Sequence, residues 1–344
     1  MNDWLTESKD QFQEKIFGFL WRQWSTLGVP GTIQSQGTAI IDPEALLLFS
    51  LNLCRYEPRL FDEIIDWLFS SGQIINVQRL QQMQLKYDFC SGPQLSAIAE
   101  LLSKKSTYRL KWSGLAKKYY QESKEPLFFD KSGNALPCPA DTEANPEFLS
   151  HGLRRGQINL RGYSQGFDPQ NPSCLLLRLR AFLGINARTE ILCLLASGQE
   201  AHPSQAARLT GYYQKTIQTT LVEMVQSGVI LTRTSKKEKF YRLKPGVLDP
   251  LLKPAGIPPQ WLNWPPLLKA NEIIWQKLFE LSKQELDSLL LYSELKKLMR
   301  SVHQYCSDAN IKDIMSYDEN LPLENFKRHF QKFLLTWVLR LVEV

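Results

Sequence analysis

Histidine is scarce in this sequence, and cysteine is dispersed. The chain has four histidines and six cysteines in 344 residues, and no two cysteines form a CxxC pair. A structural zinc site needs two closely spaced pairs of ligands, and only His303 and Cys306 form one such pair. We therefore expect no metal and no cofactor, and we expect the cysteines to be reduced thiols of an intracellular protein.

Long apolar runs are absent as well. The longest, ALLLFSLNLC at residues 45–54, is about half the length that a helix needs to cross a bilayer. The first ten residues, MNDWLTESKD, include acidic residues and precede no apolar run, unlike a secretory signal. These features predict a soluble, cytoplasmic protein with no membrane partner.

The motifs of common enzyme classes are also missing. The chain has no GxGxxG, GxxxxGK[ST], GxSxG or HExxH motif. Asp62, Glu63 and Asp66 lie within about one helical turn, but solvated acidic faces of helices are far more common than catalytic carboxylate pairs. We expect a protein that is not an enzyme.

The sequence does have an excess of basic over acidic residues, and this excess lies in one segment. The formal net charge is +6, from 41 basic and 35 acidic residues. Residues 201–245 hold eight of the basic and two of the acidic residues, so the rest of the chain is balanced. Concentrated positive charge is typical of a surface that binds nucleic-acid phosphates, although a charge run taken alone is more often a solvated face.

Apolar periodicity predicts helices through most of the chain, and breaks in the pattern divide it into five segments. We expect a helical domain at residues 1–120, a Pro/Gly-rich connector at 121–172 and a third domain at 173–245. A proline-rich linker at 246–266, which would act as a stiff spacer, precedes a helical bundle at 267–344. The predicted fold class is mainly α.

The third domain contains a helix-turn-helix pattern followed by two strand-like runs. Ala207 lies four residues before Gly211, and Ile217 and Leu221 lie six and ten residues after it. Three helices and a hairpin in this order resemble the winged helix-turn-helix domain of bacterial transcription regulators of the MarR and ArsR kind, over about residues 179–243. In that pattern the small alanine allows close helix crossing, the glycine forms the turn, and the two aliphatic residues anchor the second helix.

The resemblance implies that helix 213–226 reads the major groove of double-stranded DNA and that a basic wing at residues 231–242 holds phosphates. Glutamine can pair with adenine and lysine with guanine in that groove. The start of the helix departs from the family pattern, because Tyr213 replaces the usual capping serine or threonine. The candidate DNA-binding residues are Tyr213, Gln214, Lys215, Gln218, Thr219, Arg233, Lys236, Lys237, Lys239 and Arg242.

The resemblance predicts a sequence-specific transcriptional regulator, with repression as the expected mode. Such regulators generally bind two half-sites as homodimers, and the N- and C-terminal helical domains would dimerise, sense a signal or bind a protein partner. The alternative is a non-enzymatic adaptor or antitoxin-like subunit of a larger assembly, which uses the winged helix for protein docking or autoregulation.

Two further basic stretches are weaker candidates for contact with nucleic acid. Residues 104–124 mix lysines with aromatic residues, a pattern that a surface helix explains more simply. Arg154, Arg155 and Arg161 could lie along a minor groove as an arm, although most such segments are linkers.

Overall fold

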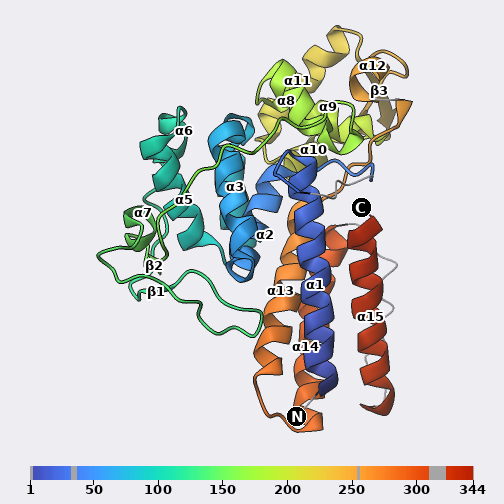
Figure 1. Cartoon of the computed structure of the whole chain (residues 1–344). Coiled ribbons are helices and arrows are strands. Elements are labelled where there is room, and N and C mark those ends of the chain that lie inside the picture. Colours follow the sequence, from blue (N-terminus) through green and yellow to red (C-terminus); the bar gives the residue numbers. More distant parts are fainter. Residues whose placement is uncertain (1–2, 32–36, 254–255, 310–322, 344) are drawn as a thin grey trace. The chain divides into compact units, whose positions relative to one another are not determined.

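The chain is mainly helical, as its sequence predicted (Figure 1). The computed structural model describes residues 3–31, 37–253, 256–309 and 323–343. The chain divides into two compact units, one made of Met1–Arg22 with Asn263–Val344 and the other of Gln23–Leu262. Within the described ranges, no helix has the length and apolar character needed to cross a bilayer.

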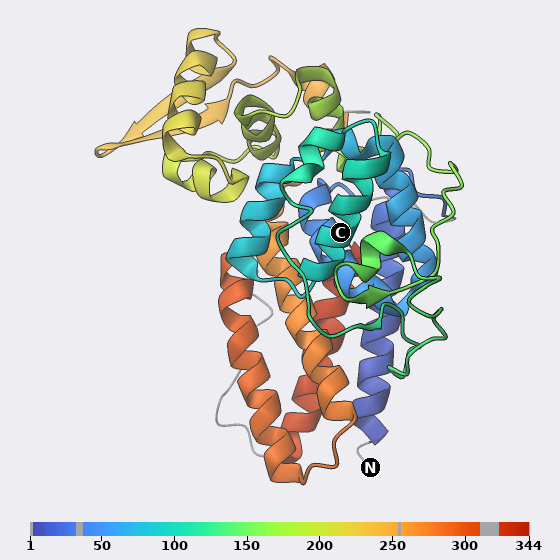
Figure 2. The same cartoon turned by 90° about the vertical axis from the view of Figure 1, so that its left-hand side faces the viewer.

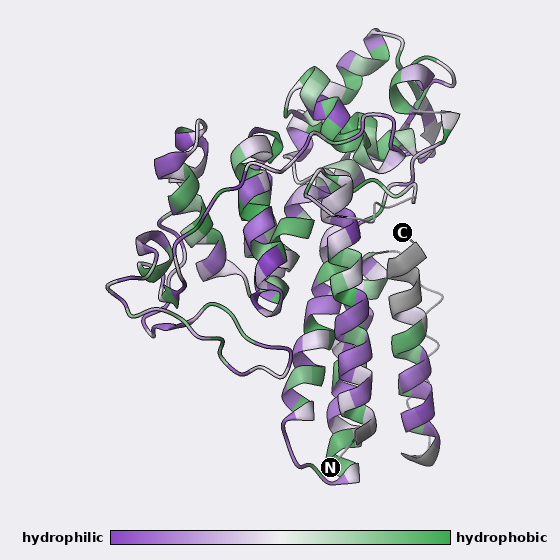
Figure 3. Ribbon diagram, viewed as in Figure 1, coloured by the Kyte–Doolittle hydropathy of each residue, from purple (hydrophilic) through white to green (hydrophobic). Residues whose placement is uncertain are grey.

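The first unit is built from long helices. These are the first 20 residues of α1 (Asp3–Thr26), with α13 (Trp264–Ser282), α14 (Ser288–Asp308) and α15 (Leu323–Glu343). Aromatic side chains join them, since the rings of Phe19 and Trp264 lie 5.9 Å apart between centroids. The indole Nε1 of Trp337 donates a hydrogen bond to Asn271 Oδ1 at 2.7 Å. Figure 3 shows the mixture of apolar and polar residues along these helices that one-sided packing requires.

The second unit begins with several short helices around a buried one. Its elements up to residue 154 are α2 (Pro43–Leu53), η1 (Cys54–Tyr56), α3 (Pro58–Ser71), η2 (Gly72–Ile74), α4 (Val77–Tyr87), α5 (Gly92–Lys105), α6 (Arg109–Ser113), β1 (Glu125–Pro126), α7 (Pro146–Leu149) and β2 (Leu153–Arg154). All 11 residues of α2 are buried, so this helix lies in the interior of this part of the unit. It starts at Pro43 because Asp42 caps it, accepting a hydrogen bond from the Ala45 N–H at 3.1 Å.

Residues 121–172, the expected Pro/Gly-rich connector, are held against α3 by its acidic side chains. Arg155 Nη1 lies 2.7 Å from Asp62 Oδ1. Asp66 Oδ1 accepts hydrogen bonds from the backbone N–H groups of Arg161 at 3.0 Å and Gly162 at 2.9 Å. The carboxylates of α3 therefore fasten a loop to a helix. Arg155 is buried between the rings of Phe128 and Phe148, so it cannot serve as an arm for a minor groove.

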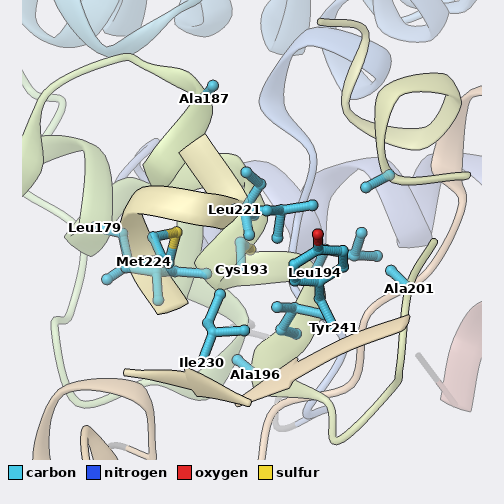
Figure 4. Close-up of a cluster of buried hydrophobic side chains, with 14 of the residues drawn as sticks. Leu179, Ala187, Cys193, Leu194, Ala196, Ala201, Leu221, Met224, Ile230 and Tyr241 are labelled. Atoms are coloured by element: carbon cyan, nitrogen blue, oxygen red, sulfur yellow. The ribbon is translucent and has the colours of Figure 1, made fainter. Parts of the chain in front are cut away.

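The second unit continues with four helices, a hairpin and a short helix. These are α8 (Leu175–Leu183), preceded by η3 (Pro172–Cys174), then α9 (Ala187–Ala196), α10 (Pro203–Thr210), α11 (Gln214–Gln226), β3 (Ile230–Ser235), β4 (Glu238–Leu243) and α12 (Asp249–Leu252). One apolar cluster joins them, and Figure 4 shows Leu221 and Met224 of α11 directed toward Cys193 and Leu194 of α9. Leu252, within the expected linker 246–266, is buried in the same cluster.

Burial predicts a sharp division of the thiols by reactivity. Cys54, Cys174, Cys193 and Cys306 are buried, Cys138 is half-buried and Cys90 is exposed. Burial raises the pKa of Cys54 and Cys193 well above the ordinary value and that of Cys174 and Cys306 to about 12. A thiol with such a pKa is ionised in roughly one molecule in 10⁴ at pH 8.

We therefore expect Ellman's reagent at pH 8 to titrate only Cys90 and Cys138 rapidly in the native protein, and all six thiols in denaturant. Cys90→Ser should remove the fastest phase. Rapid reaction of the buried thiols in the native protein would contradict the packing described for them.

Candidate nucleic-acid interface

The turn between α10 and α11 depends on a glycine. Gly211 has φ of +79°, and its N–H donates to the Ala207 carbonyl at 3.0 Å, which closes α10. A side chain at residue 211 would be strained in this conformation. Two residues later the chain enters α11 at Tyr213, whose side chain makes no capping hydrogen bond.

The two faces of α11 differ in burial. Ile217 and Leu221 are fully buried on the inner face, where they pack in the cluster with α9 and α10. All five candidate residues at the start of the helix are exposed: Tyr213, Gln214, Lys215, Gln218 and Thr219. Tyr213 is 80% exposed, an unusual fraction for an aromatic side chain. The helix therefore offers a polar outer face at its amino-terminal end.

Val222 extends this outer face and was not among the sequence candidates. Its side chain is 44% exposed, and it lies seven residues after Lys215 and three after Thr219. Those spacings put the three side chains on one side of the helix. The pattern was present in the sequence, but a valine in an amphipathic helix is most simply assigned to the core.

The β3–β4 hairpin carries the other five candidates, and its register sorts them by face. Lys236 and Lys237 form the two-residue loop, with Lys236 in a left-handed conformation at φ of 56°. Lys239 pairs with Thr234, on the face that also holds the buried Tyr241. Arg233, which pairs with Phe240, and Arg242, which pairs with Leu231, lie on the opposite face. In Figure 2 the hairpin extends away from the helices of this segment.

Glu200 pairs with both arginines and offsets one of their two charges. Its Oε2 accepts hydrogen bonds from Arg233 Nη2 at 2.6 Å and Nε at 2.8 Å, and its Oε1 lies 3.8 Å from Arg242 Nε. These contacts follow from the bridge between Ala201 and Tyr241, which places the preceding Glu200 opposite Arg242. Hydrogen bonding to Arg233 lowers the pKa of Glu200 and raises the pKa of Arg233. The charge count over residues 201–245 did not include Glu200, because Glu200 lies one residue before that segment.

The candidate lysines differ from these arginines, because the described structure gives them no carboxylate partner. Lys215, Lys236, Lys237 and Lys239 are all exposed. In the part of the chain that the structure describes, none of these four forms an ion pair, whereas Arg188 pairs with Glu223 at 2.9 Å. Among the candidate residues of the described structure, the uncompensated positive charge therefore lies at the start of α11 and at the tip of the hairpin.

A buried ionic network fixes this segment to the earlier helices of the same unit. Arg180 of α8 lies 2.5 Å from Glu44 and 2.6 Å from Glu190, and Arg79 of α4 lies 2.6 Å from Glu44. Arg79 also pairs with Asp42. Burial acts to raise the pKa of Asp42, and the charge and hydrogen bonds of Arg79 outweigh it and lower that pKa. Five charged side chains from α2 and its cap, α4, α8 and α9 thus share one interior site.

The same network reaches the turn before α11. Arg79 Nε donates a hydrogen bond to the Thr210 carbonyl at 3.1 Å, and Asn76 Nδ2 donates to Tyr212 Oη at 3.2 Å. A Cβ atom at Gly211 would lie 3.5 Å from Arg79 Cγ. Helix α4 therefore holds the corner that positions the outer face of α11.

Comparison of the chain with models of known protein families, with curated proteins and with solved structures gives no match. Three features of this surface bear on its function. They are the exposed, polar start of α11, the projecting hairpin with lysines at its tip, and the turn at Gly211, which α4 holds in place.

Proposed function

We propose that residues 173–245 form a winged helix-turn-helix that binds double-stranded DNA, and that the protein is a transcriptional regulator acting as a repressor in the cytoplasm. One observation carries the proposal. The start of α11 and the tip of the β3–β4 hairpin are exposed, and they hold four lysines that have no carboxylate partner among the described residues. Uncompensated lysines beside an exposed polar helix are what a duplex needs for affinity and readout.

Helix α11 would enter the major groove with its first two turns. The groove is about 12 Å wide, which admits one helix. Gln214 and Gln218 can pair with adenine, Lys215 with guanine, and Thr219 with bases or phosphate. Val222 can contact a thymine methyl group farther along the same side. Tyr213 and the unpaired N–H groups of the first turn would face the phosphate backbone.

The hairpin would lie along the DNA phosphate backbone beside that groove. Lys236, Lys237 and Lys239 would displace counterions from phosphates and give affinity without sequence preference. Two copies of the chain would place two α11 helices on successive half-sites, as homodimeric regulators do. The remaining helices of the chain would then serve dimerisation, signal sensing or a protein partner.

Selection from a random duplex library tests the reading role of α11. We expect the wild-type protein to enrich one motif. Lys215→Ala and Gln218→Ala should each relax the preference at one position, at a cost of about 1–3 kcal/mol in discrimination. Gln78→Ala is a matched control, since Gln78 is an exposed glutamine on α4, and it should leave the motif unchanged. Absence of any enriched motif, or the same motif from all four proteins, would contradict readout by this helix.

A further inference from the structure

In the described structure, Glu200 forms ion pairs with two cations of the hairpin, Arg233 and Arg242. Two donors of Arg233 are directed at a single oxygen of Glu200, at 2.6 and 2.8 Å. The guanidinium of Arg233 also lies 5.2 Å from the centre of the Phe240 ring on the neighbouring strand. Intramolecular contacts therefore fix the orientation of Arg233.

We propose that Glu200 is a specificity-determining residue of the DNA-binding surface, because it withholds Arg233 and Arg242 from phosphates and limits sequence-independent affinity. This inference rests on the proposed function. A phosphate that recruited Arg233 would have to displace Glu200, and the freed carboxylate would then repel the phosphate. The two arginines thus contribute less counterion release than their formal charge suggests, and binding of the hairpin at incorrect sites depends mainly on its lysines.

The positions of the cations on the hairpin support different roles for its arginines and its lysines. Arg233 and Arg242 share the face that Glu200 covers, while Lys239 lies on the other face and Lys236 and Lys237 lie at the tip. A regulator gains specificity by weakening incorrect complexes as well as by strengthening the correct one. An internal carboxylate that competes for backbone-binding arginines does so without altering the helix that reads bases.

Salt titrations on a duplex of random sequence test the inference through a double-mutant cycle of Glu200→Gln and Arg233→Gln. Each phosphate contact adds about 0.9 to the slope of log affinity against log salt concentration. We expect E200Q to tighten binding and to steepen the slope by about 0.9–1.8, for one or two arginines released. R233Q alone should leave the slope unchanged, and R233Q added to E200Q should reverse about 0.9 of the gain.

The outcomes separate this inference from the proposed function. E200Q should also reduce the ratio of specific to random-sequence affinity, whereas mere loosening of the hairpin would weaken binding to both duplexes. Equal effects of R233Q in both backgrounds, or an unchanged slope in E200Q while the wild type binds, would overturn the inference alone. Failure of the wild-type protein to bind any duplex at low salt would overturn the proposed function as well.

Discussion

Replacing Lys236, Lys237 and Lys239 together by glutamate should weaken DNA binding by roughly a hundredfold or more at physiological salt, and flatten the salt slope by about 2.7. The three lysines are exposed and none of them forms an ion pair in the described structure. Their ammonium groups are therefore available to phosphates, and reversal of their charge adds repulsion. Fluorescence anisotropy with a labelled duplex over a range of salt concentrations measures both quantities.

A matched control separates local from overall charge. Lys15, Lys131 and Lys332 are equally exposed and lie outside the hairpin. Changing these three to glutamate also removes the whole formal excess of +6, yet it should leave affinity within about twofold, because charges that make no phosphate contact release no counterions and are screened by salt. Similar losses in both triple variants would contradict a dedicated role for the hairpin.

A second variant guards against unfolding of the loop. Lys236 has φ of 56°, a conformation that costs a non-glycine residue roughly 1 kcal/mol. Lys236→Gly combined with Lys237→Gln and Lys239→Gln removes the charges and relaxes the loop at the same time. Binding should still fall steeply, with the slope flatter by about 2.7. Retained binding in this variant would mean that loop structure, and not charge, carries the contact.

Arg180→Met should destabilise the second unit by about 3–5 kcal/mol, the largest loss expected for any single change described for this protein. The Arg180 side chain is fully buried between Glu44 and Glu190. Burial acts to lower the pKa of Arg180, but the two carboxylates outweigh it and raise that pKa above its ordinary value. Removal of the guanidinium takes away the ion-pair partner that the described structure gives Glu190 and leaves Glu44 with Arg79 alone, and this costs more than an intact pair contributes.

Hydrogen exchange of the α9 amides measures this loss, because it reports opening of the unit that contains Arg180. Arg188→Met is the matched control. Arg188 pairs with Glu223 at 2.9 Å, but both side chains are about half exposed, so its loss should cost at most about 1 kcal/mol. Adding Glu190→Gln to Arg180→Met should restore part of the stability. Equal costs for the two methionine variants would show that the buried network contributes no more than a surface pair.

Local patterns predicted much of the secondary structure. The Asp42–Pro43 pair marks the start of α2, and Pro58 and Gly72 flank α3. Gly211 indicated the corner before α11, where the chain has φ of +79°. Each signal acts within about one turn of helix, through a cap, a proline ring or a missing Cβ atom, so neighbouring residues suffice to interpret it.

The candidate surface was predictable only in part. The exposed side of α11 follows from a spacing of three and four residues, which leaves Lys215, Gln218 and Thr219 outside once Ile217 and Leu221 are buried. The pairing of Glu200 with Arg233 was not predictable, because it depends on the bridge that Ala201 forms with Tyr241, 40 residues later. Contacts of that kind leave no periodic trace in the chain.

The amino-acid sequence by itself determined the helical class of this protein, the glycine turn before α11 and the concentration of positive charge in one segment. Only the tertiary structure decided that the first 22 residues join the C-terminal helices in one unit, and that Asp42, Glu44, Arg79, Arg180 and Glu190 share a buried site. It also decided which cations remain uncompensated. Periodicity and capping are short-range, whereas burial of a charge and choice of its partner depend on which distant elements pack together.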